Sequence, residues 1–421
     1  MSMNHYIVVH YSEIGLKGKN RRFFEEKLKR NIRETLRDFD IGVARRISGR
    51  LIIKISKETQ EKNWNEIKKR IERVFGISYF ALASCVRPEI KTIEKEALNL
   101  VRDKKFHSFR ITTKRSEKRF PLKSYEINKK VGAYILKKTK TNPHTIPVLR
   151  GGARGKPSHQ YISVRVKVDL EKPDLTCFIE IVENYAFLYL EKIKGPGGLP
   201  VGVSGRAICL LSGGIDSSVA AYKIMKRGVE VIFVHFESFP QTPKASQEKV
   251  RDLVKILDEY QFHSKLYFVP FLKIQKEIAI STLVQYRIIL YRRMMFRIAE
   301  EVAQKEKSLA LITGESVGQV ASQTLDNISA ISEVAKIPIL RPLIGEDKQE
   351  IIERAKAIGT YDISILPFED CCSLFVPKHP TTKANIDLVK NEEKKLKIKT
   401  LIREALKNSV VENLTLKNMP N

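Results

Sequence analysis

The stretch that decides the fold of this chain is Leu210-Leu211-Ser212-Gly213-Gly214-Ile215-Asp216-Ser217-Ser218. It follows a short apolar run and opens a segment with helical periodicity. Two adjacent glycines let a backbone turn tightly and approach a ligand closely. The amides that follow would point from a helix N-terminus, where the dipole favours an anion, and three serine hydroxyls add donors. The stretch therefore predicts a phosphate-binding loop at the carboxyl end of a buried strand.

Two common phosphate-binding patterns do not fit this loop. It lacks the Gly-Lys-Ser/Thr ending of a Walker A loop and the Gly-x-Gly-x-x-Gly spacing of dinucleotide-binding loops. The pattern Ser-Gly-Gly-x-Asp-Ser resembles the signature of the PP-loop ATP pyrophosphatases, which split ATP into AMP and pyrophosphate. That resemblance implies that Asp216 helps to place Mg²⁺ or the phosphates. The alternative is a chance glycine turn that caps a helix, which six matching positions in this context make the weaker interpretation.

Short unbroken apolar runs lie on both sides of the loop, at 207–211, 231–236 and 309–313, with helical stretches between them. Strands that are buried on both faces of a parallel sheet have this pattern. The back of the chain is therefore predicted to be a doubly wound α/β domain. The run Lys194-Gly195-Pro196-Gly197-Gly198-Leu199-Pro200-Val201-Gly202 precedes it and is expected to be a linker.

The front of the chain alternates strand-like and helix-like segments, which predicts two small α+β modules. Strands are expected near 5–10, 41–46, 49–55, 78–86, 108–113, 162–168, 176–182 and 186–191, and helices near 21–37, 63–74, 90–102 and 124–137. After about residue 385 the sequence predicts a Lys/Glu-rich helix with a polar end.

Charge separates the two halves of the chain. The net charge is +28, and residues 1–200 hold 44 Lys and Arg against 22 Asp and Glu, a net of +22. Residues 201–421 hold 32 against 26, a net of +6. A generally basic surface would not explain this asymmetry. A strongly basic first half joined to a second half of nearly balanced charge indicates a polyanion-binding module, and nucleic acid is the favoured partner.

The composition also bears on the compartment. Five cysteines in 421 residues are an odd and sparse set, which favours free thiols and a reducing environment. No apolar run of about 18 residues predicts a membrane span, and the first ten residues lack the features of a signal peptide. We expect a cytoplasmic protein.

Several stretches together resemble the tRNA 4-thiouridine synthetases (ThiI-type tRNA sulfurtransferases) along essentially the whole chain. The resemblance rests on Lys17-Gly18-Lys19-Asn20-Arg21, Lys114-Arg115 with Phe120-Pro121, residues 195–202, the loop at 212–218, Thr313-Gly314-Glu315-Ser316, residues 318–324, and Gly359-Thr360-Tyr361 leading into Glu369-Asp370-Cys371-Cys372. It implies a ferredoxin-like α+β domain at 1–75, an α+β THUMP RNA-binding domain at 76–193, a linker at 194–202, a doubly wound PP-loop domain at 203–395 and a C-terminal helix or tail at 396–421.

The resemblance also implies the reaction. Uridine eight of tRNA would be adenylated at O4 by ATP with Mg²⁺, and a cysteine persulfide would then deliver sulfur to C4. Two alternatives stay open: a PP-loop enzyme that activates another base or uses ammonia, and a tRNA-binding protein whose ATP site has degenerated. A homodimer is expected from the family alone.

Residues around the loop are expected to complete an ATP site. Gly314-Glu315-Ser316 follows a buried strand, so it should line the pocket, and Gln319 and Gln323 could read polar edges. Arg287, Arg292 and Arg293 lie on one predicted helix, where 292 and 293 point in different directions, and we assign Arg293 to ATP. The whole predicted set is Leu210, Leu211, Ser212, Gly213, Gly214, Asp216, Ser217, Ser218, His235, Phe236, Arg293, Gly314 and Gln323.

Two further features are assigned to catalysis. Lys348 lies at the start of a predicted helix, where the dipole disfavours a cation, so a phosphate-facing role competes evenly with a plain surface lysine. Cys371 and Cys372 could supply the thiolate that carries the persulfide, and we favour Cys372. The other cysteines, on apolar strands, are expected to be core residues.

RNA binding is assigned to a basic cluster around one ring. The cluster is Lys114, Arg115, Lys118, Arg119 and Lys123 around Phe120, a pattern suited to phosphate contacts and base stacking. Arg154, in a glycine-rich stretch, could touch phosphate or belong to a plain surface loop. Many family members carry a rhodanese domain, which we expect this protein to lack, and the family's thiamine role depends on that domain. Sulfur is therefore expected from a partner, a cysteine desulfurase, or as sulfide.

Overall fold

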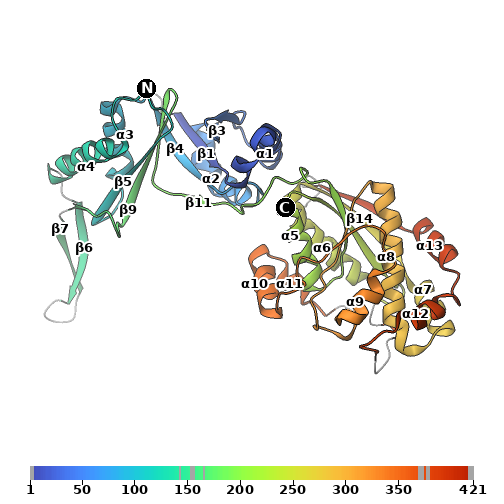
Figure 1. Cartoon of the computed structure of the whole chain (residues 1–421). Coiled ribbons are helices and arrows are strands. Elements are labelled where there is room, and N and C mark those ends of the chain that lie inside the picture. The colour runs from blue at the N-terminus through green and yellow to red at the C-terminus, as the bar shows by residue number, and fades with distance from the viewer. Residues whose placement is uncertain are drawn as a thin grey trace. The chain divides into compact units, whose positions relative to one another are not determined.

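The computed structural model describes residues 4–141, 144–151, 157–164, 166–367, 374–375 and 380–415. It divides into two compact units, both drawn in Figure 1. The first unit ends at Gly197, and the second contains the rest of the chain together with Arg73–Phe75.

One long sheet forms the centre of the first unit. Its strand order is β2 (Arg45–Ile47), β3 (Arg50–Ile55), β1 (Asn4–His10), β4 (Tyr79–Val86), β10 (Tyr185–Tyr189), β9 (Leu175–Val182), β5 (Ser108–Arg115) and β8 (Lys167–Val168), with β11 (Ile193–Lys194) beside β4. Neighbours are antiparallel as far as β9, and β5 runs parallel to both β9 and β8. Because β4 pairs with β1 and β10, this sheet runs through both predicted front modules.

Helices cover this sheet and bury its apolar side chains. They are α1 (Arg21–Thr35), α2 (Lys57–Ile71), α3 (Ile90–Arg102) and α4 (Ser124–Thr141). The unit also contains the short turns η1 (Glu13–Leu16) and η2 (Gly18–Asn20), and a separate two-stranded sheet of β6 (His144–Gly151) and β7 (Pro157–Val164). The helix expected at 63–74 begins earlier, because the hydroxyl of Ser56 accepts a hydrogen bond from the Thr59 amide and caps α2. Figure 1 shows α3 and α4 beside β5 and β9. Ile93 on α3 and Ile127 and Val131 on α4 are buried in one core with residues of β5 and β9.

The second unit contains the predicted parallel sheet. Its order is β16 (Ile339–Leu340), β15 (Leu311–Ile312), β12 (Arg206–Leu210), β13 (Glu230–Glu237), β14 (His263–Pro270) and β17 (Val410–Thr415). All neighbours are parallel except β17, which is antiparallel to β14 at the edge. The direction of strand addition reverses between β12 and β15. Ligands of doubly wound sheets bind at such a switch point.

Helices pack on both faces of this sheet, which confirms the doubly wound prediction. One face carries α5 (Ile215–Met225), α6 (Lys244–Gln261) and α10 (Lys348–Ile358). The other carries α7 (Leu272–Ser281), α8 (Arg287–Glu306), α9 (Leu325–Ser332), α12 (Ile386–Glu393) and α13 (Ile398–Lys407). The short elements η3 (Val284–Tyr286), η4 (Ala321–Gln323) and α11 (Tyr361–Ser364) join them.

The end of the chain differs from the sequence prediction of one helix with a polar end. Two helices form, the first capped by the Asn385 side chain, and Val410–Thr415 then becomes strand β17. The β-branched pair Val410 and Val411 favours a strand. Within the described part of the chain, no helix is long and apolar enough to cross a membrane.

Candidate active site

The glycine loop joins β12 to α5, as predicted, and its serines close it on itself. The Ser212 amide donates to the Ser217 hydroxyl at 3.1 Å, and that hydroxyl lies 3.2 Å from the Ser212 carbonyl. The Gly214 amide donates to the Ser212 hydroxyl at 3.2 Å. Gly214 is the N-cap of α5 and supplies no side-chain cap. The loop is thus held in shape, with the N-terminus of α5 directed at it, as anion binding requires.

Four residues predicted to bind ATP have buried side chains: Leu211, Ser218, His235 and Phe236. The Ser218 hydroxyl is buried, donates to the Ile215 carbonyl at 2.8 Å and meets Thr360 at 3.3 Å. His235 Nδ1 lies 2.9 Å from the carbonyl oxygen of Leu211, and the side chains of Leu211 and Phe236 are buried in opposite cores. Because these side chains are buried, a nucleotide could meet only the backbone of these residues.

A pocket of about 110 Å³ opens beside the loop at the switch point between β12 and β15. The structure therefore brings six of the thirteen residues that the sequence assigned to ATP into the lining of one pocket. The lining consists of Leu210, Ser212, Asp216, Ser217, Arg292, Thr313, Gly314, Glu315 and Gln323.

Gly314 allows two segments of this pocket to touch. A Cβ atom at Gly314 would lie 2.7 Å from the backbone carbon of Asp216 and 2.8 Å from the backbone nitrogen of Ser217. Only glycine permits the strand-end segment after β15 to approach the first turn of α5 this closely. This contact fixes where Glu315 enters the pocket.

The carboxylate of Asp216 is held on both oxygens. Lys348 Nζ lies 2.6 Å from Oδ1, and Gln319 Nε2 donates to Oδ2 at 2.8 Å. Lys348 is the first residue of α10, where Asp347 and Glu350 form a capping box. The capping acids and Asp216 offset the unfavourable position of Lys348 at the helix N-terminus. The sequence predicted both Lys348 and Asp216, and the structure pairs them.

The arginine assignment needs a correction, because Arg292 lines the pocket and Arg293 does not. The Arg293 side chain is 1% exposed and binds Glu393, Glu333 and the Ala330 carbonyl. Adjacent residues on a helix point about 100° apart, and sequence alone did not fix the rotation of α8.

Glu315 is the buried acid of the pocket. Its Oε1 accepts from Arg292 Nη2 at 2.5 Å, and its Oε2 accepts from Arg341 Nε at 2.6 Å and from Thr313 at 3.0 Å. Burial by itself would raise the pKa of Glu315, but the two guanidinium groups lower it below its ordinary value. Sequence reasoning missed Arg341, which enters from the segment before α10.

The predicted RNA-binding residues separate into two kinds. Lys114, Lys118, Arg119 and Lys123 are exposed and available to a polyanion. Arg115 instead donates to the carbonyls of Phe120 at 2.7 Å and Leu122 at 2.5 Å, so it shapes the loop. The Phe120 ring is 8% exposed and packs in the core under α4, which corrects its assignment as a stacking platform. Arg154 lies outside the described residues.

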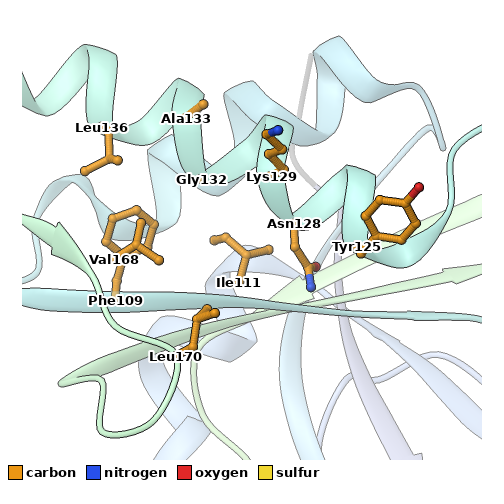
Figure 2. A pocket seen from close by; sticks show the side chains of 10 residues that line it. All are labelled: Phe109, Ile111, Tyr125, Asn128, Lys129, Gly132, Ala133, Leu136, Val168 and Leu170. Atoms are coloured by element: carbon orange, nitrogen blue, oxygen red, sulfur yellow. The ribbon is translucent and has the colours of Figure 1, made fainter.

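A groove that the sequence analysis missed lies along α4 in the first unit (Figure 2). Its volume is about 470 Å³, and its wall is mostly apolar. Tyr125, at one end of the groove, is 64% exposed, and Leu170, on its lower side in Figure 2, is 68% exposed. The helical spacing of Tyr125, Lys129, Gly132 and Leu136 could have revealed this face. The lining residues are Phe109, Ile111, Tyr125, Asn128, Lys129, Gly132, Ala133, Leu136, Val168 and Leu170.

The catalytic cysteines of the prediction, Cys371 and Cys372, lie outside the described residues. The other three are poor nucleophiles, as their assignment to the core implies. Burial raises the pKa of the Cys85 and Cys177 thiols to about 12 and raises that of Cys209 as well. Within the described ranges, no group of three His, Cys, Asp or Glu side chains could hold a metal ion.

A serine- and glycine-rich loop between a parallel strand and a helix, at the switch point of a doubly wound sheet, defines the class of PP-loop nucleotide-binding proteins. Three family models match the chain. The ThiI ferredoxin-like domain matches residues 6–81, the THUMP domain matches 88–147, and the model described as "Thiamine biosynthesis protein (ThiI)" matches 202–398.

Two curated relatives are named probable tRNA sulfurtransferase. The protein of Moorella thermoacetica is 43% identical over 96% of this chain and 96% of its own length. That of Thermus thermophilus is 41% identical over 97% of this chain and 94% of its own length. The chain therefore belongs to the ThiI family, which confirms the resemblance and the ferredoxin-like, THUMP and PP-loop folds.

Solved structures agree with this family. A 4-thiouridine synthetase–RNA complex with bound ATP has a TM-score of 0.84 and 36% identity, and covers 98% of this chain and 100% of that one. PH1313 from Pyrococcus horikoshii has a TM-score of 0.59 and 27% identity, covering 84% of this chain and 99% of that one.

Proposed function

We propose that this chain is an ATP-dependent tRNA sulfurtransferase that converts uridine eight of tRNA into 4-thiouridine. The observation that carries the proposal is the pocket at the glycine loop, where Asp216 and Lys348 meet beside the N-terminus of α5. The relatives named tRNA sulfurtransferases support the same activity, as does the similar 4-thiouridine synthetase that was solved with RNA and bound ATP.

ATP binds with its phosphates on the loop. The amides at the start of α5 and the hydroxyl of Ser212 donate to phosphate oxygens, and Arg292 adds a positive charge from the opposite wall. Mg²⁺ takes oxygen ligands, commonly one or two carboxylates together with substrate phosphates. The Asp216 carboxylate, whose side chain is 21% exposed, fits this role, and bound Mg²⁺ would neutralise charge on the leaving pyrophosphate.

In the first chemical step, uridine O4 attacks the α-phosphorus of ATP. The bond between that phosphorus and the bridging oxygen breaks, and pyrophosphate leaves with the electron pair. The loop amides, Arg292 and Lys348 stabilise the negative charge that develops. The uridine must leave its stack to reach a pocket beside the loop, as in other enzymes that modify bases.

In the second step, the terminal sulfur of a persulfide on Cys371 or Cys372 attacks C4, and AMP leaves with the O4 atom. The other cysteine then attacks the persulfide-bearing cysteine sulfur. The S–S bond breaks, the two cysteines form a disulfide, and the transferred sulfur stays on C4 as the thiocarbonyl. A thiol reductant restores the pair, and a cysteine desulfurase supplies the next sulfur.

The first unit binds the tRNA. Exposed Lys114, Lys118 and Lys123 meet phosphates. The groove along α4 is apolar and open at Tyr125, so the unpaired acceptor end places a base against that ring. A homodimer is also proposed, on the family's precedent alone.

Pyrophosphate release tests the adenylating half of the proposal. Release from ATP should rise when unmodified tRNA is added and should be lost in Asp216→Ala. If the chain binds tRNA but tRNA does not stimulate pyrophosphate release, the chain is a tRNA-binding protein without an active ATP site.

A further inference from the structure

One buried carboxylate in the nucleotide pocket joins two arginines from different elements. Glu315 follows β15, Arg292 lies on α8, and Arg341 lies just after β16. The Glu315 side chain is 2% exposed, while those of Arg292 and Arg341 are 23% and 16% exposed. Arg341 is anchored further by its bond to the Ser332 hydroxyl at 2.5 Å. Arg292 is the member of the three that combines a positive charge with a place in the pocket lining.

We propose that Glu315 is a positioning residue that holds the guanidinium of Arg292 in place for the nucleotide phosphates, with Arg341 as its anchor. The inference rests on the proposed function, because it takes ATP as the ligand of this pocket. Glu315 is not itself a phosphate-binding group, since a carboxylate repels an anion. Its effect on ATP is exerted through Arg292.

The charges of the cluster explain why an acid is needed at this position. Two guanidinium groups that meet without a carboxylate repel each other, and one would turn away. Glu315 uses one oxygen for each, so the cluster of one negative and two positive charges keeps a net charge of +1 at the pocket wall. A glutamine has one acceptor oxygen and an NH₂ group that only donates. Glu315→Gln therefore loses the hydrogen bond to one of the two arginines.

The backbone sets the position of this carboxylate before any ligand arrives. Gly314 packs against the backbone of Asp216 and Ser217, and Thr313 donates to Glu315 Oε2 at 3.0 Å. The carboxylate is thus fixed relative to the loop that carries the phosphates. An arginine held by a fixed acid loses less freedom when the ligand binds, which favours affinity.

The second unit provides a matched control. Glu393 is 8% exposed and also joins two arginines, Arg293 at 2.8 Å and Arg297 at 2.6 Å. Each of these arginines bonds both carboxylate oxygens, and neither lines the nucleotide pocket. Glu393→Gln removes the same buried negative charge between two arginines from the same unit without touching the site. A purely structural role for Glu315 predicts that the two variants behave alike.

The test is ATP binding to the full chain, measured by calorimetry without tRNA, for the wild type, Glu315→Gln, Glu393→Gln, Arg292→Lys and the double variant Glu315→Gln with Arg292→Lys. We expect Glu315→Gln to weaken ATP binding about tenfold or more and Glu393→Gln to change it less than about twofold. Both should lower the unfolding temperature. The double variant should bind ATP no more than about twofold more weakly than Arg292→Lys alone, because Glu315 acts through that arginine.

Wild-type affinity in Glu315→Gln, or losses that multiply in the double variant, would overturn the proposal. If Glu315→Gln does not fold, Glu315→Asp keeps the charge but withdraws it by one methylene, and the same coupling to Arg292 is expected. ATP binding needs no sulfur transfer. A chain that binds ATP and shows this coupling but thiolates no tRNA would overturn the proposed function and leave this inference standing.

Discussion

The ammonium group of Lys348 lies 2.6 Å from the carboxylate of Asp216, although 132 residues separate them in the chain. The pair joins the first turn of α10 to the first turn of α5, so two helix N-termini meet at the phosphate-binding loop. Both the helix dipoles and the lysine favour an anion between them. We expect ATP phosphates to take over this lysine when they bind.

Lys348→Ala should lower tRNA-stimulated pyrophosphate release by about 10²–10³-fold, the usual cost of removing one group that stabilises transition-state charge. Lys356→Ala is the control, because Lys356 is an exposed lysine on the same helix. Steady-state pyrophosphate assays on both variants check this. Equal activities for the two variants would show that Lys348 is a plain surface lysine.

Gly314→Ala should destabilise the second unit by about 1–3 kcal/mol, because the new methyl group meets backbone atoms of Asp216 at 2.7 Å and must displace them. ATP binding should weaken with it. Gly345→Ala is the matched control, since a Cβ atom there would meet nothing within 4 Å. Chemical denaturation of the two variants measures the difference, and equal stabilities would contradict the close approach.

Tyr125→Ala should weaken tRNA binding by about 1–3 kcal/mol, the cost of one lost base–ring stack. The ring is 64% exposed, so the variant should fold normally. The control is a tRNA without its unpaired 3′ nucleotides, which the wild type and the variant should bind equally. An equal loss with both RNAs would place the contact of Tyr125 elsewhere on the tRNA.

The buried cluster of Glu180 predicts a pH dependence of stability. Burial by itself would raise the pKa of Glu180, but His10, Arg50 and Tyr189 outweigh it and lower that pKa to about 2. Because the pKa of Glu180 is lower in the folded protein, its ionised carboxylate stabilises the fold at pH values above the unfolded pKa of about 4.5. This stabilisation is lost as the pH falls toward 2. This is a contribution of roughly 3 kcal/mol at neutral pH.

The measurement is the free energy of unfolding between pH 7 and pH 3 for the wild type, Glu180→Gln and Glu34→Gln, which changes an exposed acid. The gap between the wild type and Glu180→Gln should be largest at pH 7 and should shrink below about pH 4.5, whereas Glu34→Gln should follow the wild type. A gap that grows as the pH falls would contradict the sign of the shift.

The cysteine pair separates the two chemical steps. Replacing both Cys371 and Cys372 with serine should abolish thiolation, while pyrophosphate release stimulated by tRNA continues, because adenylation needs neither thiol. Single variants then show which cysteine carries the persulfide. Thiolation that survives in the double variant would argue for free sulfide as the nucleophile.

The local sequence was enough to predict the glycine loop, because the strand β12, the glycine turn and the start of α5 follow one another in consecutive residues. The doubly wound sheet followed from unbroken apolar runs for the same reason. Lys348 was found because a cation at a helix N-terminus is a local anomaly. Its partner Asp216 was found from the loop motif, and only the fold could show that they meet.

Contacts between distant segments could not be predicted in this way. Arg292 and Arg293 are equivalent in the sequence, and the packing of α8 decides which of them faces the pocket. Phe120 lies among basic residues, but its ring fills the core under α4. The hydrogen bonds from Arg115 to the carbonyls of residues 120 and 122 direct this loop inward. Arg341 contacts Glu315 because β15 and β16 are neighbours in the sheet, and the spacing of residues in the sequence does not show this pairing.

Nucleoside mass spectrometry is the decisive measurement for sulfur transfer to tRNA. Unmodified tRNA would be incubated with the chain, ATP, Mg²⁺, a cysteine desulfurase and cysteine, then digested. We expect a 4-thiouridine peak that requires ATP and disappears in Asp216→Ala. If the wild type binds the tRNA and releases pyrophosphate but yields no thiolated nucleoside, the proposed sulfur transfer is contradicted.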